Sequence, residues 1–450
     1  MMQTWATVEF ANAALGDGRL NKRLIKLAER FADKPTASIP GACADWAETR
    51  AAYRFFDQAC HLDKPLGWQD ILSPHIDATE ARMRQHPVVL CLQDTTELDY
   101  NGQQITGLGP LSHEPQRGMY LHPTYAVTPQ REPLGVTDAW MWARALKDKD
   151  GNRSGVSESL RWIEGYERVA ETAARMPDTR LVYVADREAD MLALMQRAHA
   201  LGTPADWLLR SQHNRSLPDG GKLWAEVKSG PVVGEIEFTL ARRKNQAARV
   251  VRQQLFARRI RLPAGSKDQY MDVTCLIAQE IQAPEGVKPI EWRLLSNRDA
   301  TGQDALVELI DWYRARWEIE ILFDVLKNGC RVESLQLGVQ AKLELALALY
   351  LVVAWRIGRL MRLGRTQPDM SASELFAEDE WKGAYVLAKK PVPTEVPNLR
   401  EVIRRIAMLG GFLGRKGDGE PGVKTLWLGL QIIRGFAEGV AYARENKYLE

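Results

Sequence analysis

Two apolar runs of strand length, each followed at once by an aspartate, constrain the fold of this chain more than any other feature. Residues 88–93 and 180–185 are rich in valine, leucine and other apolar residues. Such runs are typical of central strands buried on both faces of a sheet. Asp94 follows the first run and Asp186 follows the second. We therefore expect two buried strands that each end on a carboxylate.

A third carboxylate lies on a predicted helix over residues 306–327. At 100° per residue, Tyr313, Arg316, Glu320 and Lys327 share an arc of about 60°. The flanking residues are too apolar for an ordinary solvated helix, so this polar stripe predicts a face turned toward a site. The alternative is an i,i+4 ion pair between Arg316 and Glu320, which would contribute only a few tenths of a kcal/mol.

Three carboxylates from three elements indicate a site for divalent cations. Mg²⁺ prefers oxygen ligands, and the ends of adjacent strands place carboxylates well for holding it. Two such ions can activate an attacking water or hydroxyl and stabilise the leaving oxygen of a phosphoryl transfer. Asp94, Asp186 and Glu320 are the candidate ligands. The alternative for each aspartate is that it caps the turn or helix that follows its strand.

The N-terminal residues 1–66 read as helices with a basic stripe. One helix carries four cations at spacings of i, i+3, i+4 and i+7, namely Arg19, Lys22, Arg23 and Lys26. A Pro/Gly-containing loop over residues 34–41 then precedes a second helix, predicted over residues 42–57. On that helix Arg50 and Arg54 are cationic, and Trp46, Tyr53 and Phe56 are predicted core residues. Two helices around such a turn suit a DNA-docking module whose cations contact phosphates. A solvated surface is the alternative.

A β-rich segment occupies residues from about 206 to 297. It contains nine Lys or Arg residues and no Asp or Glu between positions 241 and 267. This bias predicts strands with one face turned to a polyanion. Arg210, His213 and Arg215, at and after the end of the first of these strands, would add to that face.

Composition excludes several classes of protein. Five scattered cysteines without a C-x-x-C pair argue against a disulfide framework or a zinc ribbon and fit a reduced cytoplasm. No signal sequence is recognisable, and the longest apolar run, residues 345–355, is too short to span a bilayer. The absence of a Gly-rich phosphate loop argues against a nucleotide cofactor.

The C-terminal tail is predicted to be helical, with a Gly-rich interruption over residues 414–422. Its apolar residues, which include Leu426, Trp427, Leu430, Ile432, Ile433 and Phe436, would close an intramolecular core or meet a second subunit. The sequence leaves both alternatives open.

Three motifs together carry a resemblance to a known family. They are Asp94-Thr95-Thr96, the segment Ala185-Asp186-Arg187-Glu188-Ala189-Asp190, and a Y-x-x-R-x-x-x-E-x-x-x-x-x-x-K pattern at Tyr313, Arg316, Glu320 and Lys327. The chain resembles the DD-E cut-and-paste transposases of the insertion-sequence-four family, in particular the Tn5-like branch. The resemblance extends over nearly the whole chain.

The resemblance implies an RNase H-like catalytic core of the retroviral integrase superfamily, within the α/β class. It implies a helical DNA-binding domain over residues 1–66, a catalytic domain over 67–370 with the β-rich insertion at about 206–297, and a helical, probable dimerisation domain over 371–450. Asp94, Asp186 and Glu320 would hold two Mg²⁺ or Mn²⁺ ions. The implied reactions are nicking at transposon ends, hairpin formation and opening, and strand transfer into target DNA.

The resemblance also assigns DNA contacts. Arg316 and Lys327 would hold phosphates beside the metals, and Tyr313 would help position the terminal backbone. Trp292 would stack on a base that leaves the helix during hairpin formation. From the residues alone, Trp292 is a core strand residue.

The implied partners are double-stranded DNA, at the terminal repeats and the target, and a second copy of the chain in a synaptic complex. A bacterial cytoplasm is the expected location. Two alternatives are a metal-dependent DNA nuclease of the same fold and a catalytically inactive DNA-binding regulator.

Overall fold

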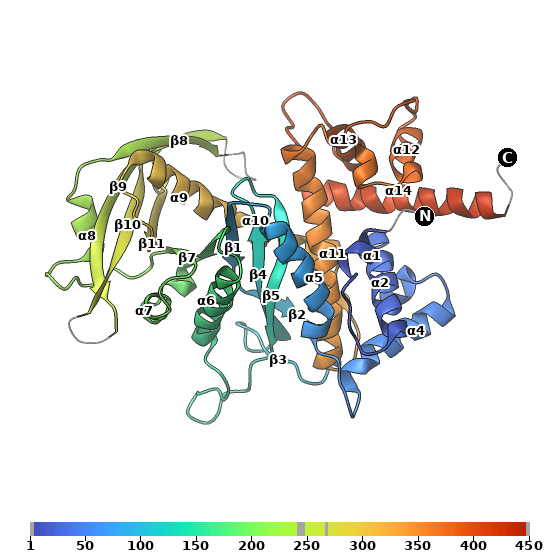
Figure 1. Ribbon diagram of the computed structural model, residues 1–450, viewed down its shortest axis with the longest axis horizontal. Coiled ribbons are helices and arrows are strands. Elements are labelled where there is room, and N and C mark those ends of the chain that lie inside the picture. The colour runs from blue at the N-terminus through green and yellow to red at the C-terminus, as the bar shows by residue number, and fades with distance from the viewer. Residues whose placement is uncertain (1–3, 241–247, 266–268, 447–450) are drawn as a thin grey trace. The chain divides into compact units, whose positions relative to one another are not determined.

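The structure is a computed structural model that describes residues 4–240, 248–265 and 269–446. The chain forms two compact units, each assembled from separate stretches of sequence (Figure 1). Unit 1 consists of Met1–Met83, Thr95–Gly155 and Glu318–Glu450, and unit 2 of Arg84–Asp94 and Val156–Trp317. Both units combine strands and helices, and the fold is of the mixed α/β class with a large mixed sheet.

Unit 2 is built on a mixed sheet with the order β1-β6-β7-β11-β10-β9-β8. The first three strands are parallel and the rest antiparallel. They span Val88–Gln93 (β1), Arg180–Ala185 (β6), Asp206–Arg210 (β7), Glu291–Ser296 (β11), Tyr270–Ile281 (β10), Arg249–Pro263 (β9) and Gly234–Leu240 (β8). The strands predicted at residues 88–93 and 180–185 are confirmed with the same bounds, and both are buried except at their first residues.

Helices cover this sheet. They are α6 (Glu158–Ala174), α7 (Leu192–Ala200), α8 (Leu223–Lys228) and α9 (Gln303–Ala315). α6 packs on β1 and β6, and α9 contacts β6 to β9 along the sheet. Gly165 permits the approach of α6, because a Cβ at this position would lie 2.2 Å from the Gln93 side chain. Gln93 directly precedes Asp94, so this close packing fixes the end of β1.

Unit 1 contains the antiparallel strands β2 (Thr96–Asp99), β3 (Gly109–Pro110), β4 (Arg117–Val127) and β5 (Pro133–Trp142). Its N-terminal helices are α1 (Trp5–Glu9), α2 (Gly18–Asp33), α3 (Ile39–Ala42), α4 (Trp46–Phe56) and α5 (Trp68–Met83). Asp17 caps α2 and Asp45 caps α4 through their side chains. The helix expected over residues 42–57 is therefore α4, which begins only after the Asp45 cap, and α3 lies mostly in the segment expected to be a loop.

The helix α11 (Gln340–Thr366) is the central element of unit 1, and Figure 1 shows it running through the unit. It is buried along most of its length and contacts α2, α5, α13 and β5. Three further helices complete the unit, namely α12 (Glu378–Leu387), α13 (Leu399–Leu409) and α14 (Val423–Glu445). Gly410 and Gly429 let α13 and α14 cross closely, since a Cβ at either would lie within 2 Å of a carbonyl oxygen of the other segment. Within the described ranges, no helix is both long and apolar enough to span a membrane.

The predicted helix over residues 306–327 is not continuous. After α9, Arg316 forms a turn, and its N–H bonds to the carbonyl of Tyr313, three residues back. α10 (Trp317–Asp324) follows, and residues Val325–Gly329 form a π-helical turn. Lys327 lies in this turn, so the assumed 100° step does not hold there.

Candidate active site and DNA-contacting residues

Asp94 and Asp186 follow two neighbouring parallel strands at the same edge of the sheet. Gln93 pairs with Ala185 in the β1–β6 register, and the two aspartates are the next residues of each strand. The carboxyl ends of parallel strands are where open α/β sheets bind ligands. The predicted proximity of these two strand ends is confirmed.

Each carboxylate has a defined partner in unit 2. Asp94 forms an ion pair with Arg316, in which both side chains are less than a fifth exposed. Asp186 accepts a hydrogen bond from the Glu188 N–H at 2.8 Å, so it does cap the short 3-10 turn that follows β6. The guanidinium of Arg316 supplies the positive charge that Asp94 needs at this depth.

Glu320 lies on α10 in unit 1, where it is half-buried. Two residues before it, Glu318 is almost fully buried and is held by Arg362 of α11, with Arg362 Nε 2.7 Å from Glu318 Oε2. Burial raises the pKa of Glu318, although Arg362 opposes the shift. Of the two glutamates, Glu318 is thus the one that is buried in unit 1 and paired with Arg362.

The described part of either unit holds no group of three His, Cys, Asp or Glu side chains close enough to bind a metal ion. What unit 2 contributes is a pair of hard oxygen donors on adjacent strand ends. That donor chemistry fits Mg²⁺ or Mn²⁺. The three-ligand set stays a prediction.

Trp292 is not a core residue. It lies half-buried on β11 and stacks on Phe238 of β8, with ring centroids 5.3 Å apart and an interplanar angle of 14°. The guanidinium carbon of Arg314 lies 5.2 Å from the Phe238 ring centroid. The sequence gives no signal for this cluster, because its members come from three separated segments.

The other residues of the predicted stripe differ in accessibility. Tyr313 is only 7% exposed, and its buried hydroxyl has no hydrogen-bond partner among the residues that the structure describes. Lys327 Nζ lies 3.8 Å from Glu333 Oε1. Their DNA contacts stay predictions.

Asp190 organises the loop after β7. It is buried, accepts hydrogen bonds from the backbone N–H groups of Gln212 and His213, and pairs with Arg215 at 2.7 Å. Arg215 is thus occupied within the protein, whereas His213 is exposed and Arg210 half-buried. The sequence motif contains Asp190, but its spacing does not reveal this role.

The five cations that the structure describes in the basic run of the β-rich segment are all engaged within the protein, and their contact with a polyanion stays a prediction. Four pair with acids brought from elsewhere, namely Arg249 with Glu280, Arg252 with Glu235, Arg258 with Glu226 and Arg261 with Asp219. Arg259 donates to the carbonyls of Asn297 and Arg298. The remaining cations of the run lie outside the described residues.

The predicted DNA-docking helices expose a different surface from the expected one. Trp46 and Tyr53 are 74% and 37% exposed, so their assignment to the core is wrong, whereas Phe56 is buried. Both aromatics flank Arg50 and Arg54 on α4, which are also exposed. Positions 46, 50, 53 and 54 share one helix face. We call Trp46, Arg50, Tyr53 and Arg54 the α4 face.

The cations of α2 are only partly available. Lys26 Nζ lies 3.0 Å from the buried Glu48 of α4, which Arg30 also binds, and Arg19 pairs with its own cap Asp17. Burial would raise the pKa of Glu48, but Arg30 and Lys26 outweigh it and lower the pKa. Lys22 is exposed and Arg23 half-buried.

Two protein-family models match the ends of the chain. A model described as Transposase DNA-binding matches residues 2–60, and one described as Transposase Tn5 dimerisation domain matches residues 352–449. The chain thus has a DNA-binding domain and a dimerisation domain of transposase type, and the two matches support DNA transposition as its function. More particularly, they support a transposase of the Tn5 type.

Among solved structures, the chain is similar to a chain in the cryo-EM structure of the piggyBac transposase synaptic complex with hairpin DNA. The likeness has a TM-score of 0.37 and 10% sequence identity, and covers 98% of this chain and 80% of that one. At this TM-score it carries no functional argument.

Proposed function

We propose that this chain is a DD-E enzyme that cuts transposon ends and joins them to target DNA, with an RNase H-like catalytic core. The observation that carries the proposal is the β1–β6 register, in which Asp94 and Asp186 follow paired residues of parallel strands. The family matches at both ends supply the DNA-binding and dimerisation domains that such a reaction needs.

Asp94, Asp186 and Glu320 would hold two divalent cations, which activate the attacking oxygen and stabilise the leaving one in phosphoryl transfer. In the DNA-free chain, Arg316 neutralises Asp94. By the same chemistry, the Arg316 guanidinium would pair with a phosphate of the DNA end. Arg316 would then stabilise the DNA-free chain and, once DNA is bound, position the DNA end.

The test uses the full-length chain, Mg²⁺ and a duplex that carries the inverted repeats found beside the gene. Nicks, hairpins and joined products are expected. Asp94→Asn, Asp186→Asn and Glu320→Gln should each lower the rate by at least about 10²-fold, because each removes charge stabilisation at the reacting phosphate.

The matched control is Glu188→Gln, which changes an exposed carboxylate two residues from Asp186. This variant should retain activity. Full activity in the three ligand variants would refute the proposal. Cleavage without hairpins or joined products would instead assign a nuclease, and DNA binding without cleavage would assign a regulator.

A further inference from the structure

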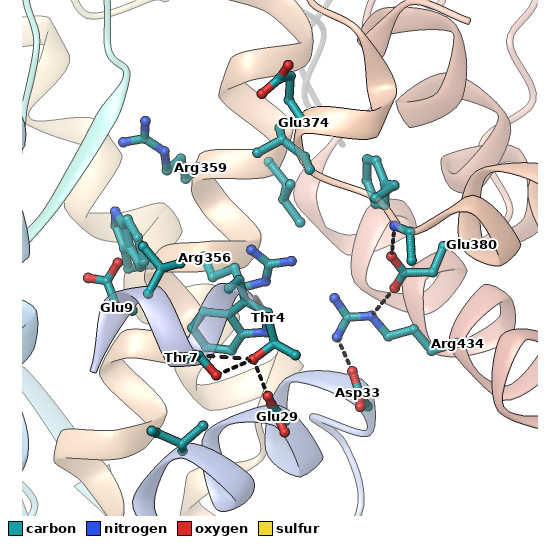
Figure 2. A pocket seen from close by; sticks show the side chains of 18 of the residues that line it. Thr4, Thr7, Glu9, Glu29, Asp33, Arg356, Arg359, Glu374, Glu380 and Arg434 are labelled. Atoms are coloured by element: carbon teal, nitrogen blue, oxygen red, sulfur yellow. Dashed lines mark hydrogen bonds and ion pairs between the residues drawn. The ribbon is translucent and has the colours of Figure 1, made fainter. Parts of the chain in front are cut away.

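Unit 1 contains a pocket of about 940 Å³ that the proposed reaction does not use (Figure 2). Its walls come from α1, α2, α11, α14 and the segment 373–380. The volume lies in the range of pockets that hold small organic ligands. The pocket combines an apolar wall with a number of charged side chains.

Almost all of the charges in this pocket satisfy one another. Arg434 pairs with Asp33 at 2.7 Å and with Glu380 at 3.3 Å, as Figure 2 shows. Glu9 is bound by Arg82, with two contacts of 2.9 Å. Asp33, Glu380 and Glu9 therefore already hold cations.

Among the lining charged side chains that are not exposed, Arg356 is the exception. Its guanidinium lies over the Trp5 ring, 4.5 Å from the centroid, and no hydrogen-bond or ion-pair partner for it occurs in the described part of the chain. Burial, with a contribution from Arg434, lowers the pKa of Arg356 to about 9. The side chain is half-buried, and its buried Nε has no hydrogen-bond partner in the described part of the chain. A buried polar group without such a partner is costly and commonly marks the place of a ligand or ion.

The wall beside Arg356 is apolar. Leu360 and Leu363 line it from α11, and Phe376 lines it from the segment before α12. All three residues are at most 3% exposed, so the wall is closely packed and only a small part of each side chain reaches the pocket. A ligand that fills this space must therefore present both a negative charge and an apolar body.

We propose that this pocket binds a small amphipathic anion, whose carboxylate or phosphate pairs with Arg356 and whose aromatic or aliphatic body lies against Leu360, Leu363 and Phe376. The site is separate from the proposed metal ligands, and its occupancy requires neither DNA nor a metal ion. The outcome of a binding test is therefore independent of the proposed catalytic function.

The test is a fluorescence titration of the full chain with 1-anilinonaphthalene-8-sulfonate, without DNA or metal. Phenyl phosphate should displace this probe at a concentration at least about tenfold lower than inorganic phosphate, because only phenyl phosphate also buries an apolar body. Benzyl alcohol, which lacks the charge, should displace it poorly. Equal potency of phenyl phosphate and inorganic phosphate would overturn the amphipathic assignment.

Arg356→Gln should weaken binding of phenyl phosphate at least about tenfold, since a charge-assisted hydrogen bond is lost. Arg356→Lys should weaken it less. Arg415→Gln is the control, because Arg415 is an exposed arginine outside the pocket. Unchanged affinity in Arg356→Gln would overturn the proposal.

A second variant covers the case in which Arg356→Gln does not fold. Phe376→Ala should weaken phenyl phosphate several-fold while leaving inorganic phosphate unchanged, and equal effects on both would count against the proposed wall. Displacement of the probe by duplex DNA, lost in Arg356→Lys, would reassign the pocket to a DNA phosphate and overturn the small-ligand proposal.

Discussion

The side chain of Trp292 in unit 2 is held in a stacked position before DNA binds. Its ring is already stacked, on Phe238, in the DNA-free chain. A ring held in this way loses little conformational entropy when its partner changes from a phenylalanine to a base. Its half-buried position on β11 leaves part of the indole available to DNA.

Replacing Trp292 with alanine should slow hairpin formation more than the first nick. Base–aromatic stacking is worth about 1–3 kcal/mol, which corresponds to roughly a 5- to 100-fold loss at the hairpin step. The two products are separated on denaturing gels with end-labelled DNA. Val250→Ala, at an exposed site on β9, is the control. An equal loss at both steps would return Trp292 to a structural role.

Also at the residue scale, the Glu9–His75 pair makes unit 1 sensitive to acid. Burial alone would raise the pKa of Glu9, but His75 and Arg82 outweigh it and lower the pKa from 4.5 to about 2. Burial lowers the pKa of His75 from 6.5. His75 Nε2 accepts the Val136 N–H, so the buried imidazole is neutral.

Both groups therefore bind protons more weakly in the folded chain than in the unfolded one. Their contribution to stability is complete above about pH 6.5 and is lost as the pH falls, first through His75 and, below 4.5, through Glu9. His75→Gln should flatten the fall in the free energy of unfolding between pH 7 and pH 5, because this variant has no group with a lowered pKa at position 75. Urea titrations at both pH values measure this, with the exposed His61→Gln as control. An unaltered slope in His75→Gln would contradict it.

At the scale of elements, α4 is the surface best suited to meet DNA. Its aromatic and cationic side chains point outward, whereas the cations of α2 are partly engaged with acids. Exposed aromatics among arginines combine phosphate pairing with stacking or packing against sugars. The orientation of α4 is set by Phe55 and Phe56, which are both buried.

Arg54→Ala should weaken binding of an end duplex and lower the slope of log affinity against log salt by about 1, because one phosphate contact is lost. Fluorescence anisotropy at several salt concentrations measures both effects. Arg415→Ala removes an exposed arginine from unit 1 outside the α4 face and serves as the control. Identical behaviour of the two variants would exclude Arg54 from the interface.

The sequence predicts the positions of the strands better than it predicts which side chains are exposed or which of them contact one another. The strands β1 and β6 were predictable because an uninterrupted apolar run of this length is typical of a strand buried on both faces of a sheet. The exposure of Trp46 was not, because an amphipathic pattern assumes that large aromatics face the core. The neutralised arginines of β9 were not predictable either, since their acids, such as Asp219 and Glu280, are distant in sequence. Contact between Asp94 and Arg316 likewise spans 222 residues and has no local signal.

At the scale of the molecule, the sequence left open whether the C-terminal tail closes a core or meets a second subunit. The helix α14 has a separate face for each role. Leu426, Trp427, Leu430 and Ile433 close a core within unit 1. The opposite side of the helix exposes Leu428, Ile432 and Tyr442, with Gly435 and Gly439 facing open space between them. Both roles are thus divided between two faces, and the outward face is the one available to a second subunit.

Ile432→Glu should therefore abolish dimers without unfolding the chain, because this side chain is 45% exposed. Sedimentation velocity with and without end DNA measures the change, and complexes with two paired ends should be lost while single-end binding persists. Val386→Glu introduces the same charge at a comparably exposed site on α12. A dimer that persists in Ile432→Glu would place the interface elsewhere.

The construction of unit 1 from three separated stretches has a consequence for synthesis. Arg434 binds Asp33 across 401 residues, and Gln431 binds Thr36 across 395. Unit 2 ends at Trp317, so a nascent chain can complete it while the partners of the first helices are still untranslated. Unit 1 closes only when α14 leaves the ribosome. The α4 face and the Glu320 helix therefore reach their final setting together, after α14 has been made, and a chain terminated before α14 would yield unit 2 with its two aspartates but no closed unit 1.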